Sequence, residues 1–196
     1  VPVFPAREGE KPVFTGLRLW VHRDVVFETD KGELVFRLRP DEAPNTAFNL
    51  LHLVDGGFYT DIAIHRVVAA LPDGRPFVVQ FGDPSGEGSG GPGYHVDLEP
   101  SALGHDFGVL SMARAQDPDS NGSQVFVCLS REGTSFLDGR YTAFGELVSG
   151  AEALRAIASE QVDGAGRPVR PVMVRRAYTR PAPAGVARAI AASAGE

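Results

Sequence analysis

The stretch from Ile64 to Tyr94 organises the rest of the chain. It reads Ile64-His65-Arg66-Val67-Val68, then an eight-residue excursion, then Phe77-Val78-Val79-Gln80-Phe81-Gly82-Asp83 and a glycine-rich run from Pro84. Apolar residues flank Arg66, whose guanidinium is permanently charged and offers five donors, and Gln80, a neutral amide. This pattern predicts an apolar groove with a few polar groups aimed into it. It does not favour a nucleophile or a metal site.

The composition is that of a single globular domain rich in turns. The chain has 196 residues, of which 43% are hydrophobic and 22% are charged, and these values are ordinary for one globular domain. Its 23 glycines and 15 prolines favour many short strands over a helical bundle. The net charge of −6 argues against nucleic acid or an anionic membrane as a general partner.

The compartment is only loosely constrained. The single cysteine, Cys128, excludes an internal disulfide and fits a reducing environment. No apolar run approaches the roughly 18 residues that span a bilayer. The chain starts at Val1 without a signal-peptide pattern. We interpret this as favouring the cytoplasm, with a periplasmic or secreted location left open if a leader has been removed.

The chain divides into an arm, a domain and a tail. We predict an extended N-terminal arm over residues 1–26, a domain over 27–180 and an Ala/Pro-rich tail over 181–196. The arm contains an alternating stretch, Leu17–Val21, which is typical of a short strand. A hairpin follows, with strands at 25–28 and 33–38 joined by a turn that contains Asp30 and Gly32.

Two helices and a series of short strands complete the expected domain. Apolar spacing predicts helices at 40–57 and 150–159, with Pro44 in the first turn of the former. Strand patterns recur at 62–68, 77–81, 94–98, 108–113, 125–129, 142–147 and 171–178. Many short strands with two helices predict a closed antiparallel barrel, which removes exposed strand edges.

Several single motifs have structural explanations. Gly86, Gly88 and Gly91 match the dinucleotide spacing G-x-G-x-x-G, but Pro92 and Gly93 follow where the phosphate-binding helix would begin. We therefore expect a flexible loop instead. His65 is expected to be a packed, hydrogen-bonded histidine, because the five histidines lack metal-site spacing. Cys128 lies in an apolar strand and is expected to be buried and unreactive.

Taken together, the motifs around Arg66 resemble those of one family. The chain resembles the cyclophilins, which are peptidyl-prolyl cis-trans isomerases. The matching segments appear in the family's order and cover residues 27–178. They are His65-Arg66-Val67, Phe77–Asp83, Pro84–Tyr94, Leu110-Ser111-Met112-Ala113-Arg114, Asn121-Gly122-Ser123-Gln124 and Leu137–Gly145. The resemblance implies an eight-stranded antiparallel β-barrel capped by two α-helices.

The resemblance also implies roles for individual residues. Arg66 is the expected catalytic arginine, and Gln80 is expected to hydrogen-bond near the substrate backbone. The expected substrate-binding residues are Phe77, Val78, Phe126 and Leu137 around the proline ring, Met112, Ala113 and Gln124 along the neighbouring groove, Arg114 through its backbone, which is expected to pair with the peptide main chain, and Phe136 and Tyr141 at the rim. No cofactor and no metal are implied.

The chain departs from the family pattern at several positions. Ile64 stands where an aromatic residue is usual, Phe81 where glycine is common and Val125 where phenylalanine is usual. Residues 69–76 form an added, hairpin-like loop beside the expected groove. Phe136 and Tyr141 stand where many members have tryptophan and histidine. Because that tryptophan contacts cyclosporin in the family, we expect any cyclosporin binding to be weak.

The expected function is acceleration of X-Pro isomerisation, which assists protein folding. The expected partners are proline-containing peptides and unfolded or flexible protein segments, with no nucleic acid and no membrane. The alternative is a module or chaperone that binds proline segments with weak or no catalysis, and Phe81 and the added loop keep it open. A third hypothesis, a nucleotide-dependent enzyme using the glycine loop, predicts stabilisation by nucleotide, which we do not expect.

Overall fold

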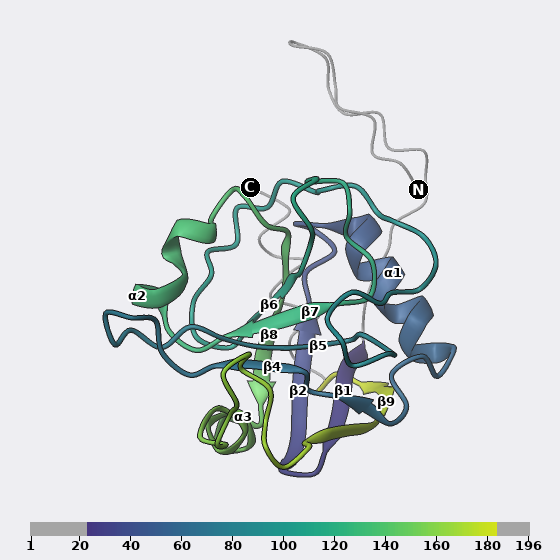
Figure 1. Cartoon of the computed structure of the whole chain (residues 1–196). Helices are drawn as coiled ribbons and strands as arrows, with labels where there is room; N and C mark the ends of the chain where they lie inside the picture. Colours follow the sequence, from purple (N-terminus) through teal and green to yellow (C-terminus); the bar gives the residue numbers. More distant parts are fainter. Residues whose placement is uncertain (1–22, 184–196) are drawn as a thin grey trace, which may run out of the picture.

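A computed structural model describes residues 23–183, and the strand predicted at Leu17–Val21 lies outside them. The described part is mainly β (Figure 1). Its elements in chain order are β1 (Arg23–Thr29), β2 (Gly32–Leu38), α1 (Pro44–Asp55), β3 (Ile62–Ala63), β4 (Arg66–Val68), β5 (Val78–Phe81), β6 (Val109–Met112), β7 (Val125–Cys128), α2 (Arg131–Thr134), a 3₁₀ turn (Ser135–Leu137), β8 (Ala143–Ser149), α3 (Ala151–Ala158) and β9 (Met173–Pro181). No helix in this described part is long and apolar enough to cross a membrane.

The strands form one curled antiparallel sheet, which confirms the predicted barrel. Within residues 23–183 nine strands pair in the order β3-β9-β1-β2-β8-β6-β7-β5-β4. The hairpin predicted from Asp30 and Gly32 is confirmed, with Thr29 facing Gly32 across its end. The two predicted helices are also present, as α1 and α3, and they lie on opposite sides of the barrel (Figure 1).

The predicted strand 62–68 is two strands, and the break between them closes the barrel. Ile62 in β3 pairs with Val174 of β9, whereas Arg66 in β4 pairs with Gln80 of β5. Ile64 and His65 form the break, and both are buried. The two ends of the strand order are therefore consecutive pieces of one segment. Counted as one strand, this segment turns the nine strands of the described sheet into the expected eight.

Other boundaries differ from the sequence-based expectation. The described part of the sheet already includes Arg23, inside the segment predicted as the arm, and Asp24 is buried there with its carboxylate accepting from the Arg37 guanidinium at 3.1 Å. The predicted strand 94–98 is wrong, since only Val96 makes an isolated bridge, to Asn121. The short helix α2 and the 3₁₀ turn after it were not predicted.

The interior of the barrel is filled by aromatic and aliphatic side chains. Phe27 makes edge-to-face contacts with Tyr59 and Phe81 at centroid distances of 5.3 and 5.0 Å. Phe81 has no exposed surface, so the bulky residue at a position where glycine is common fills the core and leaves the groove open. Such burial is worth about 1.5–3 kcal/mol for each large side chain. The barrel interior is thus a packed hydrophobic core.

Candidate active site

The outer face of strands β4, β5 and β7 positions the candidate catalytic residues. Neighbouring side chains on a strand point to opposite faces. Val79 and Phe81 therefore point into the barrel core, while Val78 and Gln80 point outward. Arg66 lies directly opposite Gln80 in the antiparallel register. The local sequence at Ile64–Asp83 thereby puts a guanidinium and an amide side by side on the outer surface of the barrel.

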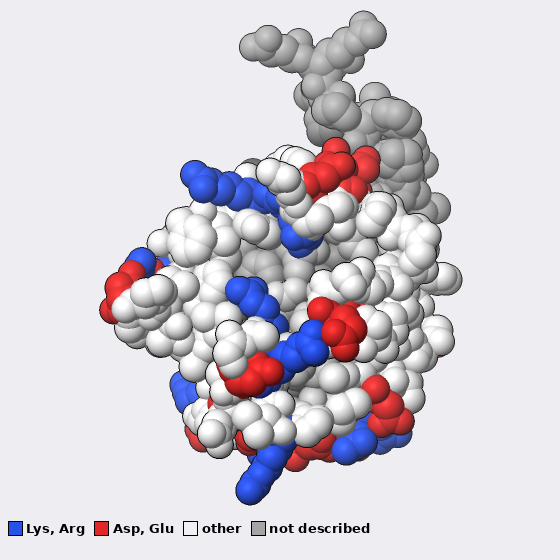
Figure 2. Space-filling model, viewed as in Figure 1, with Lys and Arg blue, Asp and Glu red and all other residues white. Residues whose placement is uncertain are grey.

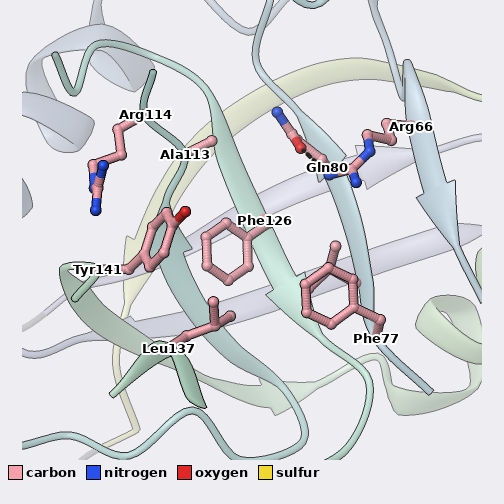
Figure 3. A pocket seen from close by; sticks show the side chains of 9 residues that line it. Arg66, Phe77, Gln80, Ala113, Arg114, Phe126, Leu137 and Tyr141 are labelled. Atoms are coloured by element: carbon pink, nitrogen blue, oxygen red, sulfur yellow. Dashed lines mark hydrogen bonds between the residues drawn. The ribbon is translucent and has the colours of Figure 1, made fainter. Parts of the chain in front are cut away.

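A pocket of about 110 Å³ opens beside this pair (Figure 3). Phe126 and Leu137 form its apolar floor, with Phe77 on one side and Tyr141 on the other. The residues that line it are Arg66, Phe77, Val78, Gln80, Ala113, Arg114, Phe126, Leu137 and Tyr141. All of them belong to the set expected from the sequence, although they come from five separate segments of the chain.

The structure does not bring every expected site residue into this pocket. Met112 is 1% exposed and packs in the barrel interior, because alternate side chains of β6 point inward and Met112 is one of them. Gln124 does not line the pocket but hydrogen-bonds to Gln80, which does. Phe136 lies at the rim, 49% exposed, with its ring stacked on Phe77 at 5.8 Å. Met112 therefore contributes to packing, and the other two lie next to the pocket.

A chain of hydrogen bonds sets the orientation of Arg66. The Gln124 amide nitrogen donates to the carbonyls of Gly88 and Gly90 at 3.0 and 2.9 Å. Its oxygen must then face Gln80, whose Nε2 donates to it at 2.9 Å. The Gln80 oxygen in turn accepts from Arg66 Nη1 at 3.1 Å. Because each amide has one donor end and one acceptor end, the loop carbonyls determine where the guanidinium is held.

Asp83 organises the glycine-rich loop that supplies those carbonyls. Its buried carboxylate accepts from the backbone N–H groups of Ser85, Gly88 and Gly90 and from the Ser85 hydroxyl. Burial by itself would raise the pKa of Asp83, but these hydrogen bonds outweigh it and lower the pKa to about 2. A side chain at Gly90 would collide with this carboxylate. The loop is held in one shape by an anion, and the next element along the chain is the strand β6, not a helix.

His65 is buried as predicted, but the expected hydrogen bonds are not formed. Within the described residues, neither of its ring nitrogens has a hydrogen-bond partner. The ring lies beneath the glycine loop, close to Gly88. Burial lowers the pKa of His65, so the imidazole is neutral at pH 7 and packs as an apolar group. Cys128 is also buried, as expected, and burial raises the pKa of its thiol to about 12.

A polar network beneath the pocket floor was not found from the sequence. The ring of His105 stacks under Phe126 at 5.9 Å, and its Nδ1 lies 2.9 Å from Asp138 Oδ1. Arg131 pairs with the other oxygen of Asp138 at 2.6 Å. Burial raises the pKa of Asp138, whereas the hydrogen bonds from Arg131 and His105 lower it. The hydrogen bonds outweigh burial, so the pKa of Asp138 is well below its usual range. His105 and Asp138 lie 33 residues apart in the sequence, so only the folded structure shows that this network supports the pocket floor.

The added loop at 69–76 lies beside the pocket wall, as the sequence indicated. Leu71 N–H donates to Arg75 O at 2.8 Å, which makes the hairpin-like turn. Arg75 donates to Glu132 O at 2.6 Å, and Ser130 Oγ donates to Pro76 O at 2.9 Å. The loop is therefore attached to α2, which leads into the turn that carries Phe136 and Leu137.

Comparisons with known proteins agree with one another. A family model described as cyclophilin type peptidyl-prolyl cis-trans isomerase/CLD matches residues 24–179. The peptidyl-prolyl cis-trans isomerase ppi1 of Schizosaccharomyces pombe is 35% identical over 159 residues, which are 79% of this chain and 97% of that protein. The peptidyl-prolyl cis-trans isomerase-like 1 of Mus musculus is 34% identical over 164 residues, covering 81% of this chain and 93% of that protein. A cyclophilin type isomerase of Cryptosporidium parvum, crystallised in the presence of the dipeptide Ala-Pro, matches with a TM-score of 0.73 and 31% identity over 80% of this chain and 98% of that chain.

Proposed function

Because the chain belongs to the cyclophilin-type peptidyl-prolyl cis-trans isomerase family, it is an isomerase of X-Pro peptide bonds, and we propose that Arg66 and the pocket beside it carry the reaction. The observation that carries this proposal is the position of Arg66. Its guanidinium lies next to an apolar pocket and is oriented by Gln80. The sequence predicts an isomerase domain at 27–180; because β1 already includes Arg23 and the family match covers residues 24–179, we propose that the domain begins before residue 27.

The chemical problem is rotation about a conjugated bond. Amide resonance gives the bond a barrier of about 18–20 kcal/mol, and X-Pro isomers exchange in tens to hundreds of seconds without a catalyst. In the twisted transition state the proline nitrogen loses conjugation and its lone pair becomes available. A donor aimed at this nitrogen binds the twisted state more strongly than either planar state. Such differential binding is the condition for catalysis.

Arg66 is the donor that meets this condition. Its charge persists at all physiological pH values, and the chain Gly88–Gln124–Gln80 holds one edge of the guanidinium. A preoriented donor does not need to reorganise during the reaction, which makes its stabilisation of the transition state larger than water could provide. Gln80 therefore acts by orienting Arg66 and by offering polar contact to the substrate backbone.

The apolar part of the site holds the proline ring while the preceding carbonyl rotates. Phe126, Leu137, Phe77 and Val78 supply flat and branched surfaces of suitable size, and Ala113 leaves room for the peptide that enters. No bond is broken, so the proposed mechanism uses only binding and orientation. Proline-containing peptides are the ligands of the family, and the match to a structure studied with Ala-Pro supports the same ligand class here. We extend this to flexible protein segments, and we propose weak cyclosporin binding because of Phe136.

The test is isomerisation of a proline peptide by the purified protein and by Arg66→Ala. Removing one preoriented donor typically costs roughly 10²–10³-fold in rate, so kcat/KM should fall by about that factor. Circular dichroism and the unfolding midpoint should stay near the wild type, because Arg66 is exposed and forms no ion pair among the described residues. Equal activity of the two proteins would overturn the role of Arg66.

A wild-type protein that binds several proline peptides but accelerates none of them would support the binding-module alternative. The structure removes one argument for that alternative, because Phe81 lies in the barrel core and does not enter the pocket. Exchange spectroscopy by NMR measures binding and exchange in one sample and needs no helper protease. It therefore separates a catalyst from a pure binder directly.

A further inference from the structure

The charges around the pocket differ from those of the rest of the molecule. Most arginines in the described part form ion pairs with a nearby Asp or Glu, as Arg175 does with Asp30 and Arg176 does with Glu28. Among the described residues, Arg66, Arg114, Arg140 and Arg170 form no ion pair. Two of these four, Arg66 and Arg114, line the pocket. An acidic chain, with net charge −6, thus places uncompensated positive charge at its active groove.

Figure 2 shows this arrangement on the face that carries the pocket. Basic side chains lie above and below the hollow in the middle of this face, and acidic side chains lie beside the lower basic group as well as toward the margins. Figure 3 places Arg66 and Arg114 on opposite sides of the pocket, with Phe126 between them. A peptide that crosses the pocket therefore passes two guanidinium groups.

Arg114 is fixed in place without a carboxylate partner. Its Nε and Nη2 donate to Arg140 O at 3.3 and 3.2 Å, and its Nη1 donates to the carbonyls of Ala115 and Gln116. These bonds use four of the five guanidinium donors. The guanidinium also stacks on Tyr141, with Cζ 4.5 Å from the ring centroid. Carbonyls and an aromatic face position the charge but do not neutralise it.

The nearest acidic residues in the same loop are engaged elsewhere. Asp117 accepts from the backbone N–H of Asp119 at 3.0 Å, and Asp119 accepts from the backbone N–H of Leu98 at 3.0 Å. Neither forms an ion pair with Arg114 within the described residues. They reduce the positive potential at Arg114 without cancelling it, which keeps the expected effect modest.

We propose that the groove prefers proline peptides with a carboxylate side chain at one of the two positions before the proline or directly after it, and that Arg114 is the main residue that selects it. The distance follows from the geometry: Arg114 covers Tyr141, which lines the pocket, and an extended peptide advances about 3.5 Å per residue. This inference rests on the proposed function of the pocket. It adds a substrate class to that function and needs no further site.

The test compares matched peptides that differ in one side chain. Exchange spectroscopy gives kcat/KM, relative to the uncatalysed rate, for Ac-Ala-Xaa-Pro-Ala-NH₂, Ac-Xaa-Ala-Pro-Ala-NH₂ and Ac-Ala-Ala-Pro-Xaa-NH₂, with Glu, Gln or Lys as Xaa. An exposed ion pair is worth about 0.2–1 kcal/mol, so Glu should be favoured over Gln by about 1.4- to 5-fold at one or more positions. Lys should be disfavoured there. Raising the salt to about 0.5 M should remove most of the preference, because exposed charges are screened.

Variants assign the preference to a residue. Arg114→Gln should bring the Glu/Gln ratio close to one, and Arg140→Gln should lower it by a smaller factor, because Arg114 lines the pocket and Arg140 does not. The matched control is Arg176→Gln on β9, which changes the net charge equally but removes an ion pair with Glu28, and Arg176 does not line the pocket. The control should keep the wild-type ratio.

The outcomes separate this inference from the proposed function. Acceleration of the neutral peptides without any preference for Glu at the three positions overturns the inference and leaves the isomerase proposal intact. A preference that survives Arg114→Gln, or that Arg176→Gln removes equally, overturns the assignment to Arg114. If no peptide is accelerated, the proposed function of the pocket fails first.

Discussion

The two faces of strands β5, β6 and β7 carry two hydrophobic clusters that differ in what surrounds them. The inner cluster includes Val79, Phe81 and Val127 and fills the barrel. The outer cluster includes Val78, Phe126 and Cys128 and is covered by α2, its 3₁₀ turn and loops. Both are buried, but only the outer one opens into a pocket with arginines at its edge. Alternation along one set of strands therefore separates the residues that stabilise the fold from those that contact substrate.

The polar contacts of the two clusters also differ. The inner cluster meets few polar groups, one of which is the Tyr59 hydroxyl that donates to Ser123 O at 2.7 Å. The outer cluster rests on the His105–Asp138 pair and lies near the Gln80–Gln124 chain. Fully satisfied networks of this kind are rigid and specify one arrangement. Rigidity at the outer face comes from hydrogen bonds, whereas the inner face gains it from packing.

Two phenylalanines on neighbouring strands give the largest expected effects and test this division directly. Phe81→Ala removes a fully buried inner side chain, and Phe→Ala in a core costs about 3–5 kcal/mol. The free energy of unfolding should fall by that amount in a urea titration. The kcat/KM of the protein that remains folded should change little, because Phe81 does not line the pocket.

Phe126→Ala is the matched variant on the outer face. It removes the pocket floor that faces the proline ring, and burying such a side chain is worth about 1.5–3 kcal/mol, so kcat/KM should fall roughly ten- to hundredfold. Its loss of stability should be smaller than that of Phe81→Ala, because water can enter the vacated space from the pocket. Equal losses of stability and activity in both variants would contradict the division into two clusters.

Replacing Asp83 should have a smaller effect on the free energy of unfolding, and this effect should depend on pH. Its pKa is about 2 in the folded protein, against a reference value of 3.8. A lowered carboxyl pKa stabilises the folded state above the unfolded pKa, and this stabilisation is lost as the pH falls through the folded pKa. The difference in unfolding free energy between wild type and Asp83→Asn should therefore shrink by roughly 1–2 kcal/mol between pH 5 and pH 2.

Chemical denaturation at several pH values measures this difference. The Asp83→Asn protein should also lose activity at pH 7 by a small factor, since the loop carbonyls that orient Gln124 depend on Asp83. The matched control is Asp73→Asn. Asp73 lies on the exposed added loop, and its partner is Arg75. A difference that stays constant with pH would mean that Asp83 does not hold the loop.

The barrel could be predicted from the sequence because its signals are local. Each turn, each short apolar run and the amphipathic stripe of α1 is formed by residues that lie close together in the sequence. The break at Ile64-His65 could not be predicted, because the apolar pattern runs through it and only pairing with β9 and β5 separates the halves. The helix α2 spans four residues, too few to show a period, and its Ser130 N-cap is a weak signal alone.

The candidate site residues, like the fold, could be predicted from the sequence only in part. Arg66, Gln80 and the pocket aromatics lie in motifs that resemble the family's, and the structure brings them together. The resemblance assigns Met112 to the groove, but alternate side chains of β6 point into the barrel, and Met112 is one of them. The support from His105, Asp138 and Asp83 depends on hydrogen bonds across the fold, which no spacing in the sequence reveals.

Chemical labelling of Cys128 has the smallest expected effect, and it tests whether solvent is excluded from the outer cluster beneath the pocket. Its side chain has no exposed surface, and burial raises its thiol pKa to about 12, so the reactive thiolate is about 10⁻⁴ of the total at pH 8. Iodoacetamide should leave the native protein unmodified over hours and should label it at once in denaturant, as followed by mass spectrometry. The Phe126→Ala protein should react faster than wild type, because that variant opens the cluster that contains Cys128, whereas Phe81→Ala, examined where it is still folded, should not. Rapid labelling of the native wild type would show that solvent reaches the outer cluster through the pocket, and hydrogen bonding would then not suffice to keep that face closed.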